Sequence, residues 1–151
     1  MSERLYMIAP ELVRLLQRTE RKQLRAVRAA ICDAAIRRAS LDDPVILEAL
    51  GVLNGSDAAS ATLRCVAAAR VEQLDSDYFD LQDAANDGRA TQDEVRHAFN
   101  RARAAAAVSF AISGEGADIT CETVYEAAAT ADDFAEIDDL VDAVLYQSND
   151  A

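Results

Sequence analysis

The chain has 151 residues, of which 51% are hydrophobic and 28% are charged, and its formal net charge is −12. This length and composition suit one domain with its own hydrophobic core and exclude collagen-like and wholly disordered proteins. We therefore expect residues 1–151 to form a single domain. Alanine supplies 32 residues, whereas glycine supplies five and proline two. Because alanine is the best helix former, the composition predicts an all-α fold.

Start and stop signals predict seven or eight helices. In chain order they are expected at residues 3–17, 19–39, 44–54, 57–74, 76–85, 91–112, 120–130 and 132–146. Pro10 leaves an alternative for the first, which is a shorter helix that begins at Ala9 with the proline in its first turn. The clearest start is the capping box from Thr91 to Glu94. Short connections favour antiparallel neighbours, so we expect a bundle of stacked helical hairpins.

No run of apolar residues reaches the length of a membrane span, and the first residues do not resemble a signal peptide. We expect a cytoplasmic protein that does not enter membranes. The three cysteines, Cys32, Cys65 and Cys121, match neither a disulfide framework nor a Cys-x-x-Cys metal site. Each is expected to fill space in the core.

Charge is distributed unevenly along the chain. Residues 1–40 hold nine basic and four acidic side chains, whereas residues 41–151 hold six basic and twenty-three acidic ones. No basic residue follows Arg103. The last third of the chain must therefore carry a strong negative field, which excludes free nucleic acid as its ligand.

Two charged stripes are candidate binding surfaces. The acidic stripe consists of Asp132, Glu136 and Asp139, with Asp142 on its flank. Its carboxylates repel one another without a basic residue on the same helix. The stripe is either a solvated face or the docking surface for a basic protein, in which case its field would accelerate association.

The second stripe, which we call the basic stripe, lies on one flank of the expected helix 19–39. Its spacing of three and four residues would let it hold phosphates, or form ion pairs with carboxylates of this chain or of a partner. The ion pairs are favoured, because aromatic residues are not interleaved and the chain is acidic overall. The stripe comprises Arg18, Arg21, Lys22, Arg25 and Arg28.

The sequence does not predict an enzyme, a cofactor or a metal site. His97 is the single histidine, and it is expected to be exposed beside Asp93, one helical turn earlier. Glu94 and His97 have the spacing of two metal ligands on one helix, but a di-iron site needs a second histidine and further glutamates. Neither a glycine-rich phosphate loop nor a nucleophile elbow occurs.

The segment from Asp83 to Glu94 resembles the twelve-residue loop of EF-hand proteins. Asp83, Asp87, Gly88 and Glu94 match positions one, five, six and twelve of that pattern. Ala85 replaces the oxygen ligand at position three, and no second loop completes a pair. A helix that ends at Gly88 followed by a capping box explains the same residues, so calcium binding is kept only as an alternative function.

The alanine-rich hairpins, and particularly the chain from Asp87 to Ala107, are similar to one helical class of bacterial immunity proteins, and the resemblance loosely covers residues 20–145. The segments that carry the resemblance are DGRATQDEVRHA and, after it, RARAAAA. The resemblance implies a non-enzymatic protein that neutralises a cognate toxin by direct binding, with no catalytic residues. The partner would be a toxin with a basic surface, held by Asp132, Glu136, Asp139 and Asp142. A helical adaptor for an unrelated protein is the other alternative.

Overall fold

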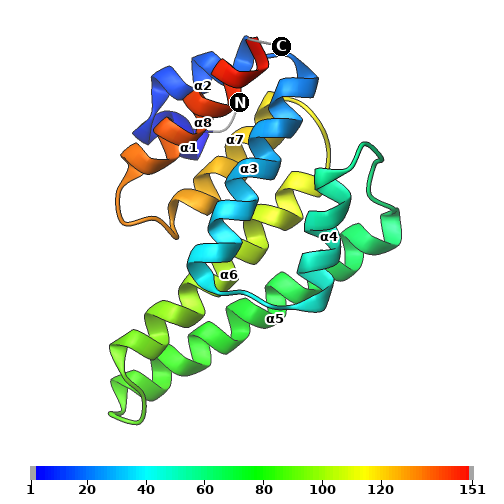
Figure 1. The fold of residues 1–151 in the computed structure, drawn as a ribbon. Coiled ribbons are helices and arrows are strands. Elements are labelled where there is room, and N and C mark those ends of the chain that lie inside the picture. Colours follow the sequence, from blue (N-terminus) through cyan, green and yellow to red (C-terminus); the bar gives the residue numbers. More distant parts are fainter. Residues whose placement is uncertain (1–2, 150–151) are drawn as a thin grey trace.

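The computed structural model describes residues 3–149, and this part of the chain contains eight helices and no strand (Figure 1). The expected all-α fold is confirmed. Loops of one to six residues join the helices. The helices are α1 (Glu3–Ile8), α2 (Pro10–Gln17), α3 (Arg21–Ala39), α4 (Pro44–Asn54), α5 (Ala61–Asn86), α6 (Gln92–Ile112), α7 (Ala117–Ala128) and α8 (Phe134–Asn149).

Local capping explains where several helices begin. Pro10 ends α1 and occupies the first turn of α2, which confirms the shorter helix that the sequence left as an alternative. Asp43 caps α4 by accepting hydrogen bonds from the backbone N–H groups of Val45 and Ile46, at 3.1 and 3.2 Å. Thr91 Oγ1 accepts one from the N–H of Glu94 at 3.1 Å and thereby starts α6, as expected.

Helix α5 differs from the expectation. The sequence predicts two helices over 57–74 and 76–85, but a single helix of 26 residues runs from Ala61 to Asn86, so it begins four residues later than expected and continues without a break at residue 75. Ser76 lies inside this helix, and Ser60 is its cap. The weak preference of Ser and Asp for helix ends is overridden here because Leu74, Tyr78 and Leu81 follow helical spacing and are buried or partly buried.

Helices α3 and α6 lie at the centre of the fold, and α3 packs against α4, α6, α7 and α8. The second half of α6 is buried on all sides, as its apolar sequence predicts: Ala104, Ala105, Ala107 and Val108 have no exposed surface. Side chains as small as alanine let helix axes approach closely, and larger residues from α2, α3, α7 and α8 fill the remaining core.

The end of α5 and the beginning of α6 form an antiparallel hairpin that projects from the bundle (Figure 1). We call residues 75–98 the arm. It contains seven carboxylates and two arginines. Among the described residues no helix is long and apolar enough to span a membrane.

Candidate functional site

A pocket of about 570 Å³ opens where the arm meets α1, α7 and the start of α8. We call it the aromatic pocket, because it is lined by five of the eight aromatic side chains in the sequence. Its volume lies within the usual range for ligand pockets. The five aromatic residues are Tyr78, Phe79, Phe99, Tyr125 and Phe134.

The rings form a packed wall on the arm side of the pocket. The centroid of the Tyr78 ring lies 5.2 Å from that of Phe79 and 5.4 Å from that of Phe99. Their planes are tilted by 52° and 58°, an arrangement in which ring edges face ring faces favourably. The continuity of α5 past residue 75 is what carries Tyr78 and Phe79 to this place.

Buried charges form another part of the lining. Glu126, of which 3% is exposed, accepts hydrogen bonds from Arg103 Nη1 at 2.7 Å and from Arg4 Nη2 at 3.2 Å. Arg103 also pairs with Asp75. Burial by itself lowers the pKa of Arg103, but the hydrogen bonds and charges of Asp75 and Glu126 raise that pKa above its usual value. The guanidinium of Arg4 lies 4.3 Å from the centroid of the Tyr125 ring, a cation–π contact.

The rim of the aromatic pocket exposes apolar surface. Ile8 and Phe79 line the pocket, yet 57% and 59% of these residues remain exposed. Apolar side chains exposed beside a pocket mark a binding surface more often than scattered ones do. The site can therefore hold an apolar group, with the Arg4, Arg103 and Glu126 network available to polar atoms next to it.

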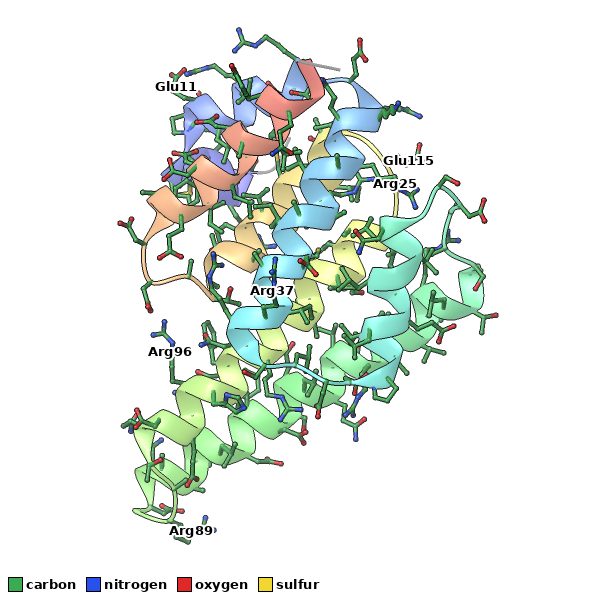
Figure 2. The ribbon with its side chains drawn as sticks, in the orientation of Figure 1. Glu11, Arg25, Arg37, Arg89, Arg96 and Glu115 are labelled. Atoms are coloured by element: carbon green, nitrogen blue, oxygen red, sulfur yellow. The ribbon has the colours of Figure 1, made fainter. Side chains whose placement is uncertain are left out.

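The acidic stripe is exposed, and the structure divides it into two parts. Asp132 precedes α8 and lies 3.8 Å from Arg96 of the arm, and Glu136 lies 3.2 Å from Arg38 of α3. Other helices therefore supply the basic neighbours that α8 itself lacks. Figure 2 labels Arg96 on the arm.

The other two members of the stripe, Asp139 and Asp142, lie along a shallow hollow beside Tyr146. Their neighbour Asp138 also belongs to this group, although the sequence stripe omits it. Burial, and after it the charges of Asp142 and Asp139, raise the pKa of Asp138. Carboxylate repulsion is therefore concentrated at residues 138–142.

The structure separates the members of the basic stripe. Arg21 lies 3.5 Å from Glu115, which is an ion pair of the expected kind. Arg25 instead donates to the backbone carbonyls of Val52, Leu53 and Asp57. Arg28 is buried and donates to Thr120 Oγ1 at 2.9 Å. Only part of the stripe is therefore on the surface.

His97 is exposed on α6, as expected, but within residues 3–149 it has no ion pair with Asp93. The calcium alternative meets a geometric obstacle. Asp83 and Ala85 belong to the last turns of α5, so the first positions of the twelve-residue pattern are helical rather than looped. No cluster of metal-ligating side chains is found in the part of the chain that the structure describes.

Sequence reasoning missed the aromatic pocket, because its lining comes from five separate helices. The paired aromatics at positions 78 and 79 and the further ring at 99 were the only local signal. No protein-family model matches the chain, and comparison with curated proteins and with solved structures finds no match either.

Proposed function

We propose that this protein is a non-enzymatic binding protein that holds a side chain of a partner protein in its aromatic pocket. The observation that carries this proposal is the gathering of five aromatic side chains around one open pocket with an exposed apolar rim. Protein interfaces depend on a few large apolar or aromatic side chains seated in such pockets. The volume of about 570 Å³ is sufficient for one or two of them.

The charges around the pocket favour a basic partner. The arm holds seven carboxylates against two arginines, and residues 132–142 hold six carboxylates and no basic residue. Asp75 of the arm and Phe134 of α8 both line the pocket, so the two acidic segments meet there. A field of this sign attracts a basic protein and accelerates its association.

The partner that we propose is a basic bacterial toxin, which the protein neutralises by binding it. The support is the resemblance of residues 87–107 to helical immunity proteins, since this segment includes much of the arm, together with the acidic surroundings of the pocket. We place this activity in the cytoplasm. Cys32, Cys65 and Cys121 are all free thiols, which fits a reducing compartment.

The test uses the purified product of the gene immediately upstream, because immunity genes accompany their toxins. We expect Phe79→Ser to weaken its binding at least about 10-fold, as loss of a central apolar contact does. Val66→Ser is the matched control, because Val66 is also an exposed apolar residue of α5 but lies outside the pocket. Equal affinities of the two variants would show that the pocket is not the binding site.

A second measurement examines the acidic stripe. Neutralising Asp132, Glu136, Asp139 and Asp142 together, by Asn and Gln, should slow association and flatten its dependence on salt between roughly 50 and 300 mM. The melting temperature should stay the same or rise, because the repulsion around Asp138 is removed. An unchanged association rate would exclude the acidic stripe from the interface. The role of the aromatic pocket would still be tested separately by Phe79→Ser.

A further inference from the structure

Arg28 is a buried guanidinium, and within the part of the chain that the structure describes it has no ion pair. Only 1% of the residue is exposed, and it is the largest of the fully buried side chains. Nη1 donates to Thr120 Oγ1, but the buried Nε has no hydrogen-bond partner among the described residues. No carboxylate of residues 3–149 lies within 4.0 Å of its nitrogen atoms. Because a buried charge is costly unless it is paired, an anion near this group would stabilise the fold.

Arg28 lines a cavity of about 130 Å³, and Arg25 and Arg64 line the same space. The cavity lies between α3, the loop from α4 to α5 and the loop from α6 to α7. Figure 2 labels Arg25 and Glu115 near each other beside this place. Three arginines from two helices thus line one small cavity.

Backbone carbonyls hold the other two arginines in position. The three carbonyls that Arg25 contacts belong to the end of α4 and the loop after it, at 2.7–3.2 Å, which is the usual role of an arginine at a helix C-terminus. Arg64 Nη1 donates to the carbonyl of Ala59 at 3.2 Å. Neither arginine has an ion pair within the described residues, so both retain an uncompensated charge. Capping of the end of α4 explains the position of Arg25, but it does not explain why Arg28 is buried.

Glu115 is one acidic residue that could neutralise these charges. It lines the cavity, but its side chain is 51% exposed and its carboxylate pairs with Arg21 at 3.5 Å. Burial, and after it the charge of Arg25, lower the pKa of Arg28, and Glu115 only partly opposes this. Asp57 also borders the cavity, so the lining holds two acidic residues against three arginines. Positive charge therefore exceeds negative charge around the space.

We propose that this cavity binds a phosphate group, either as inorganic phosphate or at the end of a small phosphate monoester, among Arg25, Arg28 and Arg64. Guanidinium groups offer paired N–H donors that match phosphate oxygens. A space of about 130 Å³ is large enough for a tetrahedral oxyanion. The site is separate from the aromatic pocket and shares no lining residue with it.

The experiment is calorimetric titration of the full chain with inorganic phosphate in phosphate-free buffer, repeated with phosphoserine. We expect saturable binding at one site below about 10 mM and a rise in melting temperature as the site fills. Binding of inorganic phosphate but not of phosphoserine would identify the free ion as the ligand. Binding of both compounds would show that the site also accepts a phosphate monoester. Either result supports the proposal.

Variants test whether the arginines hold the anion. Arg28→Met should abolish binding, and Arg64→Gln should weaken it roughly 10-fold through loss of one charged donor. Glu115→Gln should tighten binding, because a competing carboxylate is removed. Arg89→Gln, which changes an exposed arginine at the tip of the arm, is the control and should bind as the parent does.

The proposal is wrong if the parent shows no saturable binding, or if Arg28→Met binds phosphate as the parent does. It is also wrong if Arg89→Gln weakens binding as much as Arg64→Gln does, because phosphate affinity would then depend on the net charge of the protein and not on this cavity. Should Arg28→Met fail to fold, the opposite shifts expected for Arg64→Gln and Glu115→Gln decide the question, and the absence of both shifts overturns the site.

Discussion

Glu126 of α7 and Arg103 of α6 are joined by a hydrogen bond of 2.7 Å at the aromatic pocket. Arg103 reaches across from there to Asp75 at the base of the arm, while Glu126 also accepts from Arg4 of α1. The network therefore ties the first helix, the arm and α7 together around the one pocket that gathers most of the aromatic side chains. Glu126 therefore both stabilises the fold and lines the pocket that we propose as the binding site.

Replacement of Glu126 should destabilise the fold. Glu126→Ala leaves the half-buried Arg103 with one acidic partner fewer, and we expect a loss of about 2 kcal/mol in the free energy of unfolding, measured by urea denaturation. Asp87→Ala is the control, because Asp87 and Arg89 form an exposed pair at the tip of the arm. Its change should stay within about 0.5 kcal/mol. Equal losses for the two variants would contradict a structural role for the Glu126 network.

Asp43 should make stability depend on pH in the acid range. Burial by itself raises its pKa, but Arg70 and the N–H groups of Ile46 and Val45 together lower it below the usual value. The ionised form is therefore favoured in the folded state. The ionised Asp43 makes its full contribution to the free energy of unfolding above the pKa of the unfolded state, about 3.9. This contribution is lost as the pH falls through the lower pKa of the folded state.

The measurement is urea denaturation of the parent and of Asp43→Asn from pH 7 downward. The variant should be less stable by about 1–2 kcal/mol at pH 7, and the gap should close below about pH 4. Asp42→Asn serves as the control, because the side chain of Asp42 is 91% exposed. A gap for Asp43→Asn that stays constant down to acid pH would refute the assignment.

The three cysteines should differ sharply in reactivity. Cys65 is exposed on α5, which corrects the expectation that all three fill the core, whereas Cys32 and Cys121 are buried. Burial raises the pKa of Cys32, and burial with the charges of Asp118 and Glu122 raises the pKa of Cys121 to about 11. Because the thiolate is the reactive form, a thiol reagent at neutral pH should label one site per folded chain and three after unfolding. Labelling of the folded Cys65→Ser variant at the parent's rate would contradict this assignment.

Two glycines should respond to alanine in opposite ways. Gly88 has a φ of +77° where α5 ends, so Gly88→Ala should cost about 1 kcal/mol. Gly51 lies inside α4, and an added Cβ would meet nothing within 4 Å, so Gly51→Ala should stabilise the protein by about 0.4–1 kcal/mol. Thermal unfolding followed by circular dichroism measures both. Changes of the same sign would contradict the strained backbone assigned to Gly88 or the unstrained helical position assigned to Gly51.

Local signals in the sequence are sufficient to predict the fold class and the boundaries of several helices. Capping residues and helix-breaking residues act within one turn, so Pro10, Asp43 and Thr91 are sufficient to position the starts of α2, α4 and α6. The apolar spacing of the last helix likewise predicts its buried face, where Ile137 and Val141 have no exposed surface. The predicted break at Ser76 failed because packing of the arm helices against each other outweighs a weak local preference.

Contacts between side chains of different helices could not be predicted in this way. Arg38 and Arg96 reach the acidic stripe from other helices, Arg28 is buried next to Thr120, and five aromatic rings from four helices surround one pocket. Arg28 and Thr120 are 92 positions apart in the chain. Helical periodicity specifies the face on which a side chain lies, but the partner of that face depends on how the helices pack, and no local pattern in the sequence records that arrangement.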